Sequence, residues 1–343
     1  MAEDLRTVLK CVHCGTCRAY CPVFEELGWE STNARGRVLI SHAILEGQEI
    51  DESIIKTIAT CTTCGLCEEM CPAGATPPSV VESARKQLTG KGLQTEAQKG
   101  LAETTIEKGN PLGEEKSRLH WMEEQELPEK AEYVYFVGCM NSYRYPEVAK
   151  KTFELLKPYG VSPLSDEVCC GSPLERTGSD ASELIEHNIR QIREMGAHTI
   201  ITGCAGCYAA LRKYYPDDLK IIHVAEFLAD KIEALDIKKQ DLVVSYHDPC
   251  HLGRSGGVYD APRKLIEEAT TLVEMASHHE TSHCCGGGGG VRRGYPDLSL
   301  KIAERRISEM PEEAELLVTS CPLCRSNLEQ ACKKKIIDIV ELL

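Results

Sequence analysis

The residues best suited to chemistry in this chain of 343 residues are its nineteen cysteines, which stand beside only two tryptophans and four phenylalanines. Cysteines in such number have three ordinary explanations: disulfides, zinc sites and iron–sulfur clusters. The first thirty residues contain no apolar segment of the kind that a signal peptide needs, so nothing directs the chain to an oxidising compartment. We therefore expect a cytoplasmic protein whose cysteines bind metal.

Eight of the cysteines form two copies of the motif Cys-x-x-Cys-x-x-Cys-x-x-x-Cys-Pro, at residues 11–22 and 61–72. This is the spacing of bacterial two-cluster ferredoxins, in which the fourth cysteine of each motif binds the other cluster. Two zinc sites are the alternative, but zinc ribbons usually present separate Cys-x-x-Cys pairs. We predict two cubane [4Fe–4S] clusters, the first held by Cys11, Cys14, Cys17 and Cys71 and the second by Cys61, Cys64, Cys67 and Cys21. Between the motifs, we expect Arg35 and Arg37 to offset the negative clusters rather than to dock a partner.

Ten further cysteines fall into two sets that repeat along the chain. Cys139 matches Cys250 at an offset of 111 residues, the Cys-Cys pair at 169–170 matches that at 284–285 at 115, and the Cys-x-x-Cys at 204–207 matches that at 321–324 at 117. An offset that drifts by so little indicates a duplicated unit. Cys332 belongs to neither set, and we interpret it as an unligated thiol on the last helix.

Each copy of the unit shows the same order of short apolar strands and amphipathic helices. The expected strands are 133–137, one near Val161 and 199–202 in the first copy, and 242–246, one near Leu272 and 316–319 in the second. The expected helices are 146–157 and 182–195, then 262–269 and 298–310. Alternating strands and helices predict parallel α/β layers, and the cysteines fall where strands end, which is where such sheets place ligands.

The chain divides by composition into four segments. We expect a two-cluster ferredoxin-like module with a helical extension (80–108) at residues 1–108, an acidic connector at 109–131, and the two copies at 132–240 and 241–343. The predicted fold is thus a helical module followed by two Rossmann-like α/β domains. A net charge of −14 excludes a nucleic-acid partner, and no apolar run is long enough to span a membrane.

Each copy reads Cys, about 30 residues, Cys-Cys-Gly, about 34 residues, Cys-x-x-Cys. This pattern resembles the Cys-Cys-Gly domain found twice in the heterodisulfide reductase family, and the module in front makes the architecture similar to the D-type subunits of that family. The strings at 246–254, 286–290 and 320–324 strengthen the resemblance. It implies a noncubane [4Fe–4S] cluster in each copy, held by Cys139, Cys169, Cys170, Cys204 and Cys207 in the first and by Cys250, Cys284, Cys285, Cys321 and Cys324 in the second. Zinc remains possible in the first copy, because it needs only four thiolates.

The resemblance implies a catalytic disulfide reductase subunit that passes electrons through the cubanes to the ten-cysteine sites. These sites would reduce a small-molecule disulfide, such as the coenzyme M–coenzyme B heterodisulfide, to two thiols. The electron donor would be a membrane cytochrome b or a flavoprotein, which would place the chain at the inner face of the membrane through its partner. The alternative is an electron-transfer subunit of a flavin-dependent glycolate, lactate or glycerol-3-phosphate dehydrogenase. No G-x-G-x-x-G loop stands between a strand and a helix, so we expect no flavin or NAD in this chain.

Several residues near the second set of cysteines are candidates for supporting roles. His247 and His251 flank Cys250 and either donate hydrogen bonds or protons at the cluster or are structural. The arginines at 254, 292 and 293 either bind an anionic thiol or lie at the surface. The glycines 286–290 either let substrate or backbone approach the second cluster or form a plain loop.

Overall fold

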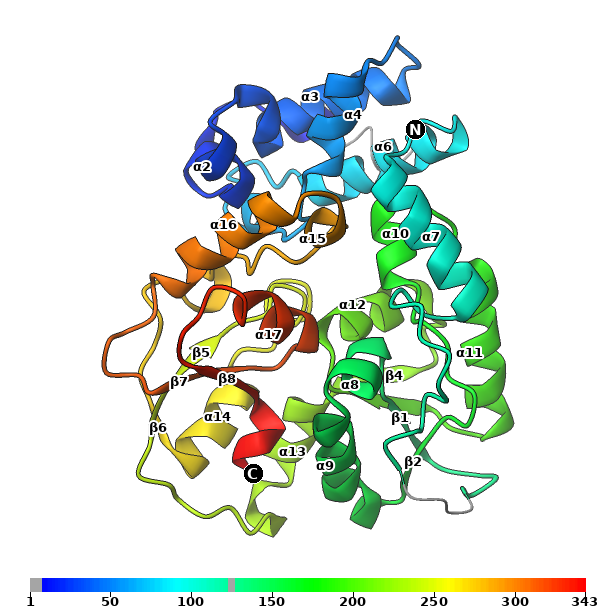
Figure 1. Ribbon diagram of the computed structural model, residues 1–343, viewed down its shortest axis with the longest axis vertical. Helices are drawn as coiled ribbons and strands as arrows, with labels where there is room; N and C mark the ends of the chain where they lie inside the picture. The colour runs from blue at the N-terminus through cyan, green and yellow to red at the C-terminus, as the bar shows by residue number, and fades with distance from the viewer. Residues whose placement is uncertain (1–7, 123–126) are drawn as a thin grey trace.

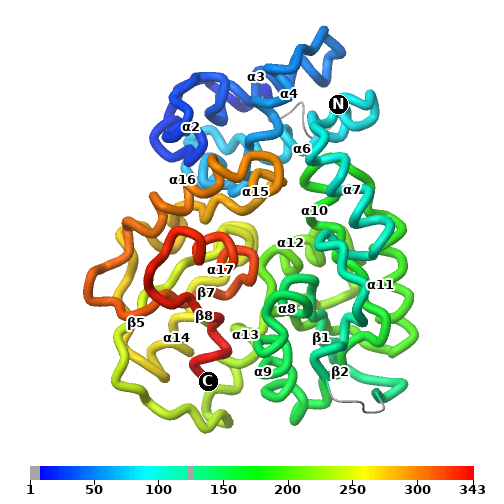
Figure 2. Tube along the Cα trace, in the orientation of Figure 1, coloured from blue at the N-terminus to red at the C-terminus, as the bar shows by residue number. Residues whose placement is uncertain are grey.

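The computed structural model describes residues 8–122 and 127–343. An all-helical part, here called the helical module (residues 8–108), is followed by two α/β parts (Figure 1), the first copy (132–240) and the second copy (241–343). The trace in Figure 2 shows the helical module lying across one end of both copies. The mixed helical and α/β class expected from the sequence is confirmed.

The helical module contains short helices joined by the cysteine loops. Its elements are η1 Thr16–Ala19, α2 Pro22–Leu27, η2 Glu30–Thr32, α3 Ala34–Leu45, α4 Glu52–Ala59, α5 Leu66–Glu69, α6 Pro77–Gly90 and α7 Glu96–Lys108. The side chain of Asn33 caps α3 by accepting from the amide of Gly36, and Thr95 forms a capping box with Gln98 at the start of α7. The helical extension expected over 80–108 is present as two helices, α6 and α7, and the chain turns between them, where Gly92 has a left-handed backbone (φ 71°).

Each copy is built on one parallel sheet of four strands. The first contains β1 Tyr133–Phe136, β2 Val161–Pro163, β3 Thr199–Thr202 and β4 Lys220–His223 in the order β2-β1-β3-β4. The second contains β5 Val243–His247, β6 Thr271–Leu272, β7 Leu316–Thr319 and β8 Lys335–Asp338 in the order β6-β5-β7-β8. The two orders correspond strand by strand, so the duplication inferred from the cysteines is confirmed. The sequence predicted the strands β3 and β7 with their observed bounds but not the edge strands β4 and β8.

Helices connect the strands in both copies. The first has α8 Cys139–Arg144, α9 Pro146–Leu156, η3 Lys157–Tyr159, α10 Ser172–Thr177, α11 Ser182–Glu194, α12 Ala205–Tyr214, α13 Val224–Asp230 and η4 Ile232–Ala234. The second has α14 Asp260–Ala269, η5 His279–Thr281, α15 Val291–Gly294, α16 Pro296–Ile307, α17 Pro322–Leu328 and η6 Ile339–Leu342. The four predicted helices of the copies are present as α9, α11, α14 and α16, each within three residues of its expected ends.

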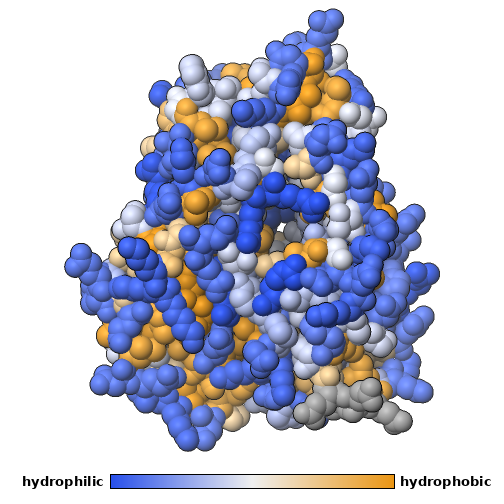
Figure 3. All heavy atoms as spheres, in the orientation of Figure 1, coloured by the Kyte–Doolittle hydropathy of each residue, from blue (hydrophilic) through white to orange (hydrophobic). Residues whose placement is uncertain are grey.

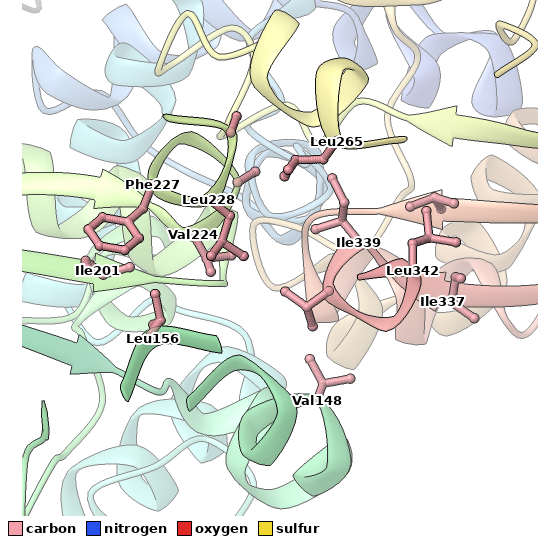
Figure 4. Close-up of a cluster of buried hydrophobic side chains, with 14 of the residues drawn as sticks. Val148, Leu156, Ile201, Val224, Phe227, Leu228, Leu265, Ile337, Ile339 and Leu342 are labelled. Carbon is pink, nitrogen blue, oxygen red and sulfur yellow. The ribbon is translucent and has the colours of Figure 1, made fainter. Parts of the chain in front are cut away.

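The two copies share one apolar core. Figure 4 shows Val148, Leu228 and Phe227 of the first copy facing the same cluster as Leu265 and Ile339 of the second. The same contact occurs twice across the seam. The helix after the first strand of each copy (α9 or α14) packs on the helix after the last strand of the other copy (η6 or α13), so the two copies are related by a pseudo-two-fold axis. Burial of apolar surface across this seam holds the copies together as one body.

The helical module rests on the ends of both sheets. The Arg85 guanidinium donates to the carbonyl of Arg176 in the first copy (2.7 Å), and Arg254 of the second copy donates to the carbonyl of Cys64 (3.0 Å). Glycines allow this close approach: a side chain at Gly178 would place its Cβ 2.4 Å from the backbone of Arg85. Within the described residues, no helix has the length and apolar content needed to cross a membrane.

Candidate metal centres

The cysteines of the helical module line two small cavities. Those assigned to the first cubane (Cys11, Cys14, Cys17, Cys71) line one, and those assigned to the second (Cys21, Cys61, Cys64, Cys67) line the other. Cys67 also reaches the first cavity, which places the two cavities next to each other. Each cavity therefore combines three cysteines of one motif with the Cys-Pro cysteine of the other.

The loops around these cavities direct polar hydrogen atoms at sulfur. Gly15 (φ 83°) and Gly65 (φ 78°) have left-handed backbones, and the amide of Thr63 lies 3.4 Å from the Sγ of Cys61. The buried Arg37 places Nη1 3.8 Å from the Sγ of Cys21. Amide groups and a guanidinium of this kind compensate negative charge on cysteine sulfur, so the surroundings fit anionic clusters.

The five cysteines of the first copy meet at the carboxyl end of its sheet. Cys139 follows β1 and begins α8, and Cys204 follows β3 and caps α12, whose first turn contains Cys207. Cys169 and Cys170 stand in the loop between β2 and α10, where Gly171 has φ 92°. All five are buried. Their thiols interact in the order 139, 169, 170, 207, 204.

The second copy repeats this arrangement with Cys250, the pair Cys284 and Cys285, and Cys321 with Cys324. Their thiols interact in the order 250, 284, 285, 324, 321. Cys332 is partly buried and packs against the apolar cluster that contains Cys285, Cys321 and Cys324. The expectation that Cys332 sits on the last helix is wrong, because α17 ends at Leu328 and Cys332 lies in the segment leading to β8.

Two further thiol contacts join the separate sites. Cys64 of the helical module interacts with Cys284 of the second copy, and Cys204 of the first copy interacts with Cys321 of the second. The thiols therefore form one continuous path, from the helical module through the second copy to the first. The guanidinium of Arg254 lies beside the first junction, and its pKa is raised by Cys64, Cys250 and Cys284 against the opposing effect of burial.

A cavity of about 440 Å³ opens at the seam between the copies. Figure 3 shows a hollow near the centre of this face with hydrophilic side chains around it. The cavity is lined by all five cysteines of the first copy, the glycines 287–290 of the second, and the arginines 144, 176, 292 and 293. None of the second copy's five cysteines lines it.

The glycine run was expected either to let substrate or backbone approach the second cluster or to form a plain loop, and in the structure the backbone of the helical module approaches it. A Cβ at Gly289 (φ 59°) would lie 2.4 Å from the carbonyl oxygen of Cys61, and one at Gly288 would lie 2.7 Å from that of Thr62. The run therefore packs closely on the cysteine loop of the helical module. Its other side faces the cysteines of the first copy.

The two histidines proposed from the sequence as supporting residues lie in different surroundings. His251 places Nδ1 3.0 Å from the Sγ of Cys250, and burial lowers the pKa of His251 to about 3. His251 also lines a second cavity of about 710 Å³, between α6, α10 and α12, which has charged walls. His247 is fully buried beside Cys285 and Cys324.

The three arginines proposed from the sequence also lie at different places. Arg292 and Arg293 line the seam cavity, and Arg292 donates to the hydroxyl of Ser326 (2.8 Å). Arg254 is partly buried and does not line that cavity; it donates to the carbonyls of Cys64, Glu280 and Ser282. Sequence reasoning missed Arg176, which joins the cavity wall to the loop at Thr62 and Thr63. A single arginine on an amphipathic helix carries no signal of such burial.

Comparison with known proteins finds matches to the helical module and to both copies. A model described as a cysteine-rich domain matches residues 133–212 and 244–329, and a 4Fe-4S dicluster domain matches residues 7–75. The D subunit of the dihydromethanophenazine:CoB–CoM heterodisulfide reductase of Methanosarcina barkeri is 33% identical over 99% of this chain and 94% of its own length. The corresponding protein of Methanosarcina mazei is 34% identical over 99% of this chain and 92% of its own length.

A more distant relative is the EtfAB:quinone oxidoreductase of Syntrophomonas wolfei, which is 28% identical over 78% of this chain and 43% of its own length. The resemblance stated from the cysteine motifs is therefore confirmed. With matches along its whole length and both domain types in place, this chain belongs to the family of heterodisulfide reductase D subunits and is an iron–sulfur oxidoreductase subunit that transfers electrons.

Proposed function

We propose that this chain is the subunit of a disulfide reductase in which the S–S bond is broken. The observation that carries this proposal is the seam cavity, where five buried cysteines face four arginines at one end of the thiol path. Noncubane [4Fe–4S] clusters on the two five-cysteine sets and cubanes in the helical module would supply single electrons to the substrate. The overall reaction consumes two electrons and two protons and converts one disulfide into two thiols.

The residues of the cavity can bind and orient such a substrate. Arg293 is exposed and donates to the carbonyl of Gly100 (3.3 Å), and Arg292 stands beside it on α15, so both can turn toward an anionic group. Arg144 pairs with Glu114 (2.6 Å) at the rim. Carboxylate, sulfonate or phosphate groups on the disulfide would therefore be held with the S–S bond near the first copy's cysteines.

The path of thiols supports a direction for the electrons. The helical module touches the second copy through Cys64 and Cys284, and the second copy touches the first through Cys321 and Cys204. Electrons from a partner would enter at the first cubane, where Cys14 is exposed. That partner would be a membrane cytochrome b or a flavoprotein, and the former would hold the chain at the inner face of the membrane.

A second candidate is an electron conduit that serves another enzyme. The similarity to the EtfAB:quinone oxidoreductase favours it, because that relative is named for a quinone and not for a disulfide. In this case the seam cavity would have no disulfide to bind.

Metal analysis and electron paramagnetic resonance of the anaerobically purified chain distinguish these proposals. We expect about sixteen irons per chain and, after oxidation with coenzyme M present, a paramagnetic signal that requires the thiol. Reduced viologen should then reduce the heterodisulfide of coenzymes M and B. About eight irons with zinc would overturn the ten-cysteine cluster assignment. Intact clusters that respond to no thiol would favour the conduit.

A further inference from the structure

His247 stands at the end of β5 and contacts the buried cysteines of the second copy. Its side chain is fully buried, and its ring lies with the sulfurs of Cys285 and Cys324 in a group whose ligand atoms are within 4.8 Å of one another. The Nε2 atom has no hydrogen-bond partner among the described residues. Such an atom in a dry environment needs an acceptor, and sulfur is the one at hand.

The other ring nitrogen determines which proton His247 carries. The Nε of Arg306 donates to Nδ1 of His247 at 3.0 Å. A guanidinium has hydrogens to donate and no lone pair to accept with, so Nδ1 must present its lone pair. A proton on Nδ1 would point at the N–H group of Arg306, so the proton of the ring sits on Nε2.

Arg306 cannot turn away from this contact easily. Its guanidinium is fully buried and donates to the carbonyl of Ser277 (2.9 Å) and the hydroxyl of Ser282 (3.1 Å). It also pairs with Glu309 (2.5 Å). Because every one of these contacts orients the same planar group, the donor to Nδ1 is held in place.

This geometry distinguishes two roles for His247, an iron ligand and a hydrogen-bond donor. A histidine that binds iron through Nε2 must present a lone pair there, whereas the proton on Nε2 leaves only a donor. We propose that His247 donates a hydrogen bond from Nε2 to the sulfur of Cys285 and raises the reduction potential of the second copy's cluster. The inference rests on the proposed function, which assigns Cys285 as a ligand. Hydrogen bonds to ligand sulfur stabilise the more negative, reduced state of a cluster.

The first copy has a different residue at the position equivalent to His247. The offset of 111 residues that relates Cys250 to Cys139 relates His247 to Phe136. Phe136 packs in one apolar cluster with Cys170, Cys204 and Cys207, and its ring offers no N–H group.

The test is a redox titration followed by electron paramagnetic resonance on the full chain loaded with its clusters. His247→Phe installs the residue of the first copy, and we expect it to keep its iron while one cluster shifts to a more negative potential. His247→Gln keeps an N–H group near the place of Nε2, and we expect it to restore most of the lost potential. An unchanged potential in His247→Phe overturns the proposal, and so does loss of iron in both variants, which would indicate a ligand.

A second measurement needs no variant. In wild-type protein with ¹⁵N-labelled histidine, hyperfine spectroscopy should show the weak nitrogen coupling of a hydrogen bond. The strong coupling of a directly bound nitrogen would overturn the proposal. Failure of the ten-cysteine cluster assignment is separate and visible first, because the wild-type protein would then contain only about eight irons. Failure of disulfide reduction alone would leave the clusters and this hydrogen bond in place.

Discussion

The two copies have the same frame and different surroundings. Both place five cysteines at the carboxyl end of a sheet with the same strand order. In the first copy these cysteines face an open cavity with arginines, whereas in the second they lie beneath the helical module, next to His247 and Arg254. Duplication thus keeps the positions of the cysteines, and the neighbouring residues determine which set faces the cavity and which set lies under the helical module.

The largest expected effect comes from removing one set of ligands at a time. Cys284→Ser with Cys285→Ser should lose about four of about sixteen irons and stop electrons from reaching the first copy. The matched pair Cys169→Ser with Cys170→Ser should lose as much iron but leave the second copy reducible by the helical module. Iron analysis and rapid-mixing reduction measure both. If the first copy of the Cys284→Ser, Cys285→Ser variant were reduced as fast as in the wild-type protein, the proposed path would be contradicted.

The next effect tests the glycine run that only the second copy has. Gly289→Ala should destabilise the protein by about 2–4 kcal/mol, because its Cβ would meet the carbonyl of Cys61 at 2.4 Å in a left-handed backbone. Gly257→Ala is the matched control, since Gly257 is also left-handed (φ 74°) but has open space around it. Its cost should be only the backbone strain, about 1 kcal/mol. Chemical denaturation measures both variants, and equal costs would contradict the close packing.

A smaller effect is expected at the arginines that the second copy contributes to the cavity. Arg292→Gln or Arg293→Gln should raise KM for an anionic disulfide about tenfold, about 1.4 kcal/mol, with kcat unchanged. Arg305→Gln is the control, because Arg305 lies on α16 outside the cavity and pairs with Glu26 (2.8 Å). Steady-state kinetics over a range of salt concentrations would show the difference. An unchanged KM in both cavity variants would place substrate binding elsewhere.

The smallest effect concerns the ion pairs that tie each copy to the helical module. Lys213 of the first copy pairs with Glu82 (2.8 Å), and Arg305 of the second pairs with Glu26 (2.8 Å). Both cations are about half exposed, so Lys213→Met and Arg305→Met should each cost below about 1 kcal/mol. Double-mutant cycles with Glu82→Gln and Glu26→Gln measure the pair terms. A coupling above this range would mean that one copy depends on its surface contact with the module.

Local patterns in the sequence were sufficient to predict many of the strands and helices of the two copies. The runs at 199–202 and 316–319 are short, apolar and rich in β-branched residues, and they form the strands β3 and β7 as predicted. The edge strands β4 and β8 were missed, although the similarity of their two segments is visible in the sequence. Each is only four residues long and begins with an exposed lysine, so periodicity alone could not identify it.

The surroundings of the sites could not be predicted in the same way. Arg306 belongs to an amphipathic helix on which a neighbouring arginine, Arg305, is exposed, and only the fold shows which of the two is buried. The meeting of Cys204 with Cys321 depends on how the copies pack at the seam. Contacts of this kind join residues more than a hundred positions apart, where spacing carries no information.

The shared core at the seam also determines when the first copy can finish folding during synthesis. Lys151 of α9 donates to the carbonyl of Glu341, 190 residues later, and the apolar faces of α9 and α13 have no cover until α14 and η6 exist. At about 5–20 residues per second, roughly 10–40 s of synthesis separate Lys151 from Glu341. During that interval the ribosome-bound first copy displays apolar surface and thiols together. The apolar face of α9 is therefore covered only after the last residues of the second copy have been made.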